Sequence, residues 1–203
     1  MKNSAIQYRH PWLYSLGIKF LYFDALKILK DMVGKGKKVF EPACGYGRVK
    51  KYLYSCCNYS GIDLNKYFVD YGKRKGRDIK MGDILDRKSY KVSDIIILCD
   101  ILHHLSMDKM KKLVSIATKY AKEKVVIIEP LFVDVASKKN IFSRFLANVF
   151  SRVDNDGINK ISTWLSKEDY DNLFQELNKL NNFVDMKIQV FRRHCFVEFI
   201  VKS

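Results

Sequence analysis

The sequence predicts an α/β fold, in which a mostly parallel sheet is covered by helices on both faces and ends in a C-terminal antiparallel hairpin. Short, almost wholly apolar runs alternate with amphipathic stretches of helix length, a pattern typical of parallel sheets buried on both faces. The last two apolar runs, 186–191 and 195–201, are joined by a connection too short for a helical crossover, so they should pair antiparallel. The composition, 48% hydrophobic and 29% charged in 203 residues, is that of a globular chain.

Four apolar runs in the first two thirds of the chain are expected to form parallel strands. They span residues 38–41, 59–63, 94–100 and 124–129 and are mostly apolar on both faces. Amphipathic stretches between them predict helices over 48–55, 66–75 and 108–122. In the last stretch apolar residues recur at helical spacing, while lysines occupy the opposite face.

One more helix is expected on each side of this alternation. Residues 16–33 show an apolar helical pattern that Gly34 and Gly36 would end, and Ser166 is a suitable N-cap for a helix through Leu180. The length suits a single domain. We expect it to comprise an N-terminal helical cap (1–36), a core (37–130), an insertion (131–165) and a C-terminal helix with its hairpin (166–203).

The insertion is expected to contain a basic amphipathic helix over residues 141–153. Its apolar side chains fall at i, i+3, i+4, i+7, i+8 and i+11, and basic residues flank the stripe. Such a helix could form a substrate lid, rest on an anionic membrane surface, or pack on the sheet as an ordinary helix.

The charge is strongly positive, since 37 Lys and Arg stand against 22 Asp and Glu, for a net +15. Such a balance attracts anions, including nucleic acid and lipid head groups. However, the lysines are scattered from Lys2 to Lys202 rather than forming one block. A general compositional bias therefore explains the charge better than a dedicated nucleic-acid surface. No run is long and apolar enough to predict a membrane-spanning helix.

The five cysteines show neither the spacing of a zinc site nor that of a disulfide framework. An odd number of thiols without such a framework is typical of reducing compartments. We therefore expect a cytoplasmic protein with no bound metal.

The most informative stretch runs from residue 39 to residue 48. An apolar strand ends at Glu41, a turn of small residues follows, and a helix is expected to begin. Ligands of open α/β sheets bind at such strand ends. A dinucleotide would require GxGxxG, but the third glycine is missing after Gly45 and Gly47, and Glu41 would repel a diphosphate. A ligand with a cationic amino acid end fits this turn better.

Residues 41–47 resemble the first motif of the class I S-adenosylmethionine (SAM)-dependent methyltransferases, an acid followed by GxGxG, with Ala43 in place of the first glycine. Three later segments resemble the family's next motifs in the same order. Asp63 ends the second strand, Asp83 follows the third, and residues 94–105 resemble the fourth strand and its exit in the small-molecule, type-11-like branch. The resemblance implies a Rossmann-like, seven-stranded, mostly parallel sheet and SAM as the cofactor.

The resemblance also implies which residues hold the cofactor. Its ribose hydroxyls suit Asp63 and its adenine amine suits Asp83. Its ammonium group suits carbonyl oxygens near Ala43 and Asp100 or, through water, the Glu41 carboxylate. The full expected set is Glu41, Ala43, Cys44, Gly45, Gly47, Asp63, Leu64, Asp83, Ile84, Asp100 and Ile101.

Two histidines follow the fourth strand. His103 or His104 could act as a general base toward a hydroxyl acceptor, but a histidine at the second position is common in this branch without that role. A structural role is therefore our first expectation, and of the two His103 is expected to face the substrate. Substrate contacts are expected from Tyr8 and His10, before the first helix, and from Arg152.

These observations favour a methyltransferase that acts on a small molecule, with an apolar or lipid-like acceptor suggested by residues 141–153. An RNA methyltransferase is the alternative that the charge, residues 73–75 and Arg77 favour. Against it, residues 100–103 lack the Asn/Asp-Pro-Pro-aromatic motif that would stack on a base and bond its amine. A third possibility is a protein that binds SAM without transferring its methyl group.

Overall fold

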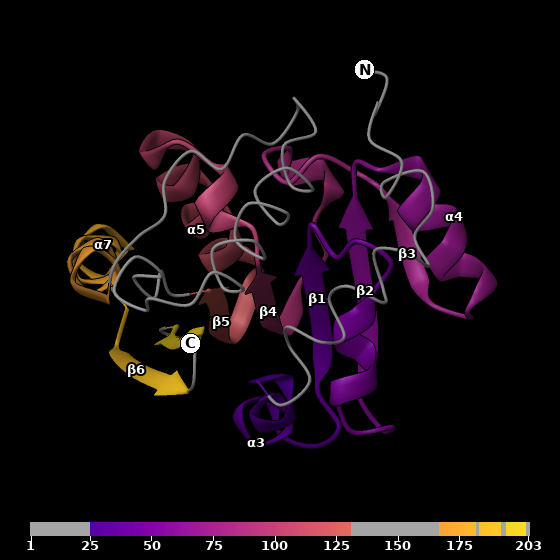
Figure 1. Ribbon diagram of the computed structural model, residues 1–203, viewed down its shortest axis with the longest axis horizontal. Helices are drawn as coiled ribbons and strands as arrows, with labels where there is room; N and C mark the ends of the chain where they lie inside the picture. The colour runs from indigo at the N-terminus through magenta and orange to yellow at the C-terminus, as the bar shows by residue number, and fades with distance from the viewer. Residues whose placement is uncertain (1–24, 131–166, 182, 192–193, 202–203) are drawn as a thin grey trace, which may run out of the picture.

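Figure 1 shows the computed structural model, which describes residues 25–130, 167–181, 183–191 and 194–201. The strands are β1 (Lys38–Pro42), β2 (Asn58–Asp63), β3 (Asp78–Met81), β4 (Ser93–Cys99), β5 (Ala121–Pro130), β6 (Asp185–Phe191) and β7 (His194–Ile200). The α-helices are α3 (Leu29–Val33), α4 (Lys66–Arg74), α5 (Met107–Tyr120) and α7 (Lys167–Asn181). Short 3₁₀ helices are η1 (Ala25–Ile28), η2 (Arg48–Tyr52), η3 (Arg87–Ser89) and η4 (Leu102–His104).

The seven strands form one sheet in the order β3-β2-β1-β4-β5-β7-β6. The first five are parallel, and β7 pairs antiparallel with both β5 and β6. The predicted mostly parallel sheet with a C-terminal antiparallel hairpin is therefore confirmed. The order of strands reverses between β1 and β4, and open α/β sheets bind ligands beyond the carboxyl ends of strands at such a switch point. The arrowheads of β1 and β2 point to this edge in Figure 1.

Helices cover both faces of the sheet because its central strands are apolar on both faces. Ile96 lies in one buried cluster with residues of α5 and α7, and its neighbour Ile95 lies in another with residues of α3 and α4. Both isoleucines are fully buried. Burial of each such side chain contributes about 1.5–3 kcal/mol to folding. The two clusters hold the strand ends at fixed positions relative to one another.

Two local features differ from the sequence-based expectation. Residues 48–55 form only the short η2, because Gly47 before it is left-handed (φ 73°) and Leu53 after it is extended. The third strand, β3, was implied only through the motif that follows it, since it has four residues of which only Ile79 is buried. The first part of the expected helix 16–33 and the insertion 131–165 lie outside the described residues.

All five cysteines are free thiols, of which Cys56 is exposed and the other four are buried. Within residues 25–130 and the described parts of 167–201, no three His, Cys, Asp or Glu side chains lie close enough to hold a metal ion. No helix in these same parts of the chain has the length and apolar character needed to cross a membrane.

Candidate functional site

The turn after β1 has a left-handed backbone at three positions, Ala43 (φ 57°), Gly45 (φ 55°) and Gly47 (φ 73°). This conformation costs a non-glycine residue roughly 1–2 kcal/mol, so neighbouring contacts must hold Ala43 in it. The Cys44 N–H donates to the Ile62 carbonyl oxygen at 2.9 Å, and the Gly47 N–H donates to the Cys44 carbonyl oxygen at 2.8 Å. The turn is therefore anchored to β2.

Asp63, at the tip of β2, fastens the same turn through its side chain. Its Oδ2 accepts a hydrogen bond from the Gly45 N–H at 2.7 Å, and its Oδ1 accepts one from the Asn65 N–H at 2.7 Å. Burial raises the pKa of Asp63 above its ordinary value, although both N–H bonds act in the opposite direction. Because a carboxylate has about four acceptor sites, both oxygens keep capacity for the hydroxyl groups of a ligand.

Glycines let the turn lie directly on β2 and approach a ligand. A Cβ atom at Gly61 would lie 2.8 Å from both the Cys44 Cβ and the Glu41 carbonyl oxygen, so no larger residue fits there. A Cβ atom at Gly45 would meet, among the described residues, only the Phe68 ring at 3.7 Å. The backbone at Gly45 is thus accessible on that side.

Arg77 supports the turn from within the protein. It is 9% exposed; its guanidinium donates to the Tyr46 carbonyl oxygen and lies 5.2 Å from the centre of the Tyr46 ring. The expectation that Arg77 contributes to a cationic surface is therefore wrong, since the side chain is turned inward. The cations at residues 73–75 are exposed.

The acid at the end of β1 is buried and bonded to a tyrosine. Glu41 is 3% exposed, and its Oε2 accepts a hydrogen bond from the hydroxyl of Tyr59, a buried residue of β2. Burial raises the pKa of Glu41 to about 8, although the Tyr59 hydrogen bond and the nearby Arg48 lower it. The sequence indicated Glu41 but not Tyr59, because an aromatic residue in a strand has the signature of a core position.

An ion pair spans the switch point between β1 and β4. Arg48 Nη2, at the start of η2, lies 3.3 Å from Oδ2 of Asp100, which follows β4. Asp100 also has a left-handed backbone (φ 56°), fixed in part by its N–H, which donates to the Ile128 carbonyl oxygen at 2.9 Å. Strained backbone conformations of this kind cluster at functional sites. Ala43 and Asp100 thus flank the switch point with their backbones turned in the same unusual way.

Glu129, near the end of β5, organises the segment after β4. It is fully buried, and its Oε1 accepts hydrogen bonds from the Ile101 N–H at 2.9 Å and the Leu102 N–H at 2.8 Å. Its Oε2 accepts the His103 N–H at 3.4 Å and lies 2.7 Å from the His103 Nδ1. Sequence reasoning missed Glu129, since a single acid near a strand end gives no sign that its partners lie 26–28 residues upstream.

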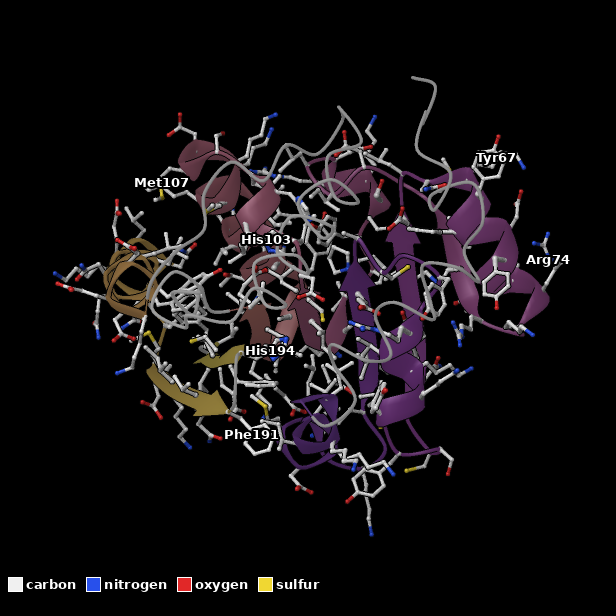
Figure 2. All side chains as sticks on the ribbon, viewed as in Figure 1. Tyr67, Arg74, His103, Met107, Phe191 and His194 are labelled. Carbon is white, nitrogen blue, oxygen red and sulfur yellow. The ribbon has the colours of Figure 1, made fainter. Side chains whose placement is uncertain are left out.

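His103 is less exposed than expected. It is 5% exposed, and its backbone N–H and its Nδ1 both face the buried carboxyl group of Glu129. The ring of His104, which is half-buried, lies 4.0 Å from that of His103, centre to centre. Figure 2 labels His103 and also His194 of β7, whose pKa falls to about 4 because burial and the positive charge of Arg48 disfavour its protonated form.

The remaining cofactor candidates lie near the tips of β2, β3 and β4. Leu64, directly after Asp63, is 64% exposed although apolar. Asp83 is exposed, and its Oδ1 accepts the Leu85 N–H at 2.8 Å, while Ile84 is buried and Ile101 half-buried. The structure thus brings the acid Asp83, after β3, and the exposed apolar side chain of Leu64, after β2, to the ends of two neighbouring strands. Tyr8, His10, Arg152 and residues 141–153 lie outside the described residues.

This set of groups fits an adenosine held by its sugar better than a dinucleotide. Asp63 and Asp83 are hydrogen-bond acceptors for hydroxyl and amine groups, whereas a diphosphate requires N–H donors at the start of a helix. Here the turn is followed only by the five-residue η2, and the carboxyl group of Glu41 lies beneath it. The residues therefore fit a SAM-type ligand.

No protein-family model matches the chain, and no curated protein matches it by sequence. Solved structures do match it. Magnesium protoporphyrin IX methyltransferase of Synechocystis PCC 6803, with bound SAH, has a TM-score of 0.63 and 12% identity over 92% of this chain and 84% of its own. Human N-acetylserotonin methyltransferase, in complex with SAM, has a TM-score of 0.66 and 16% identity over 96% of this chain and 56% of its own.

A third structure is a SAM-dependent methyltransferase of Thermotoga maritima, described as a possible histamine N-methyltransferase. It has a TM-score of 0.67 and 12% identity, covering 97% of this chain and 98% of its own. The chain thus spans the whole of one such protein and little more than half of the human enzyme. These similarities establish that the protein has the fold of the class I SAM-dependent methyltransferases.

Proposed function

We propose that the protein is a SAM-dependent methyltransferase that acts on a small-molecule acceptor. The observation that carries this proposal is the position of Asp63, whose carboxylate joins the tip of β2 to the Gly45 N–H in the turn after β1. At that position it can accept hydrogen bonds from the two ribose hydroxyls. The methyltransferase fold and the absence of a dinucleotide-type turn support the same ligand.

The cofactor would be held along the carboxyl ends of β1 to β4. Asp83 and the Ile84 backbone would bind the adenine edge, and the apolar side chains of Leu64 and Ile101 would pack against its ring faces. Carbonyl oxygens of the turn after β1 and of Asp100, together with the Glu41 carboxyl group, would receive the ammonium end. When bound, SAM supplies a methyl group that is already activated by the sulfonium charge, so the protein mainly has to orient the acceptor and exclude water.

His103 is the candidate general base. Both oxygens of Glu129 already accept backbone N–H groups, and Oε2 lies 2.7 Å from His103 Nδ1, so this carboxyl group favours the His103 tautomer that carries its proton on Nδ1. The other ring nitrogen, Nε2, is then an acceptor that could take a proton from a hydroxyl or amine of the acceptor molecule. General bases of this kind contribute typically 10²–10⁴-fold to a rate. The proposal that the acceptor is apolar, with contacts from Tyr8, His10 and Arg152, rests on the sequence pattern alone.

Calorimetry with S-adenosylhomocysteine, SAM and NAD tests the cofactor assignment. We expect both SAM-type ligands to bind and NAD not to bind. Asp63→Asn should weaken SAM binding at least tenfold, because a charged acceptor contributes about 1.5–3 kcal/mol per hydrogen bond. Asp94→Asn is the matched control, since Asp94 also accepts a strand N–H, that of Lys38 at 2.8 Å, but at the opposite edge of the sheet. Binding of NAD alone would refute the proposal.

An RNA methyltransferase is the second candidate, favoured by the exposed cations near the end of α4. Figure 2 shows Arg74 and Tyr67 projecting from α4 away from the sheet. A methyl-transfer assay on cell extract fractionated into lipids, metabolites and RNA distinguishes the acceptors. A steep loss of RNA binding with salt would support the RNA function. SAM binding without transfer to any fraction would indicate a non-catalytic binding protein.

A further inference from the structure

We propose that Tyr59 is a positioning residue that holds a neutral Glu41 carboxyl group beneath the turn after β1, and that binding of the cofactor's ammonium end expels the proton of Glu41. This inference rests on the proposed function, because it takes SAM as the ligand. It adds two properties that the fold alone does not imply: a role for a core tyrosine, and a proton released on binding.

The surroundings of Glu41 favour its neutral form. Glu41 is 3% exposed, and among the described residues no ion pair includes it. The nearby cation, Arg48, forms its ion pair with Asp100 instead. A buried carboxylate without a paired cation is costly, so such groups usually keep their proton.

Three charged groups act on Glu41, and they lie in β2, directly after β4 and in η2. Asp63 from β2 and Asp100 from β4 raise its pKa by repulsion, and Arg48 from η2 lowers it by attraction. Burial is the largest effect and raises the pKa of Glu41 to about 8, so the neutral form of Glu41 predominates near neutral pH. Cys44 lies close enough to Glu41 for their charges to interact, but burial raises the pKa of its thiol well above the ordinary value, so Cys44 adds no negative charge near neutral pH.

Burial and close packing hold the Tyr59 hydroxyl in the position from which it donates to Glu41. It is 3% exposed, and a Cβ atom at Gly47 would lie only 3.2 Å from its hydroxyl oxygen. The hydroxyl can donate to the neutral and to the ionised carboxyl group, and it binds the ionised form more strongly. Tyr59 therefore fixes the orientation of Glu41 and keeps its proton removable.

An ammonium group placed at the turn supplies the positive charge that the buried site lacks. Its attraction lowers the pKa of Glu41, and the carboxyl proton passes to the buffer. At low pH, removing the proton of Glu41 costs free energy and lowers the affinity for the ligand. Below about pH 8 the affinity should therefore increase by up to tenfold for each unit by which the pH rises.

Titration calorimetry of S-adenosylhomocysteine in two buffers of different ionisation enthalpy measures the protons released. At pH 6.5, where an α-amino group is still largely protonated, the protein should release close to one proton per ligand. Glu41→Gln, which cannot titrate, should release none, and its affinity should not change between pH 5.5 and 7.5. Release below 0.2 proton by the unaltered protein, or equal release by Glu41→Gln, would overturn the inference while leaving SAM binding intact.

Tyr59→Phe tests the role of the hydroxyl. Without this donor the pKa of Glu41 rises, so affinity at pH 7 should fall about tenfold and the pH range of proton release should extend upward. Tyr54→Phe is the control, because the Tyr54 ring is half-buried and contacts Lys30 and Lys35 near α3 rather than Glu41. A Tyr59→Phe variant that folds and keeps the original pH profile would refute the positioning role. Failure of S-adenosylhomocysteine to bind at any pH would instead refute the proposed function.

Discussion

Replacing Glu129 by glutamine tests how far the segment after β4 depends on the buried carboxyl group. In the unaltered protein, Oε1 of Glu129 accepts hydrogen bonds from the N–H groups of Ile101 and Leu102. Its Oε2 accepts the N–H of His103 and lies next to Nδ1 of the His103 ring. Glutamine keeps one acceptor oxygen but puts an NH₂ group in place of the other. The backbone N–H and the ring Nδ1–H of His103 then face the NH₂ group of the glutamine, which is also a donor.

The expected loss follows from these two contacts. A buried donor without a partner costs about 1–3 kcal/mol, so Glu129→Gln should destabilise the protein by about 2–4 kcal/mol. For a chain of this size, 1 kcal/mol corresponds to roughly 2–4 °C in the melting temperature. We therefore expect a fall of roughly 5–15 °C in thermal denaturation at pH 7. The rate of methyl transfer should fall as well, because His103 loses the group that fixes its tautomer.

Glu198→Gln is the matched control for the activity measurement. Glu198 lies on the neighbouring strand β7 and pairs with Lys124 at 2.5 Å, away from the segment after β4. The rate and the affinity for SAM should both be retained in this variant. A Glu129→Gln protein that melts within 2 °C of the original and keeps its full rate would refute the role given to Glu129.

Three further predictions concern the turn and the pH dependence. Gly61→Ala should destabilise the protein by about 1–3 kcal/mol in urea denaturation, because its Cβ would lie 2.8 Å from Cys44; an unchanged midpoint would contradict this. Arg77→Met should keep much of the burial but lose the bond to the Tyr46 carbonyl oxygen, so SAM affinity should fall several-fold; an equal affinity would show that the turn needs no such support. The depressed pKa of His194, about 4, means that the unfolded chain binds its proton first, so stability should be lost as the pH falls from 6.5 toward 4. Relative to the original protein, His194→Gln should lose about 3 kcal/mol less over this range in urea denaturation, and parallel stability profiles would count against the assignment.

The sequence predicted the parts of the fold that repeat a simple pattern. The apolar runs at 94–100 and 124–129 correspond to β4 and β5, since strands buried on both faces show few polar residues. The hairpin at the end of the chain followed from its short connection. The short β3 lies at the sheet edge with one buried residue, Ile79, so its pattern was too weak to define its bounds.

The candidate site was predicted where its residues lie next to a strand end in sequence. Glu41 and Asp63 each end an apolar run, and the turn after Glu41 is rich in small residues. Glu129 and Tyr59 could not be predicted in the same way, because their contacts are with residues that only the order of strands brings close. The burial of His103 likewise depends on β5 lying beside β4.

The arrangement of the thiols offers a practical route to the binding measurements. Cys56 precedes β2, at the edge of the sheet opposite the turn after β1, while Cys44, Cys99 and Cys195 are shielded and burial raises the pKa of each thiol. A maleimide fluorophore should therefore label the native protein at Cys56, with no engineered cysteine. The dye would lie at the opposite edge of the sheet from the strand tips and would leave them uncovered. The labelled protein could therefore be followed by its fluorescence, or attached to a surface through Cys56, while a ligand is added.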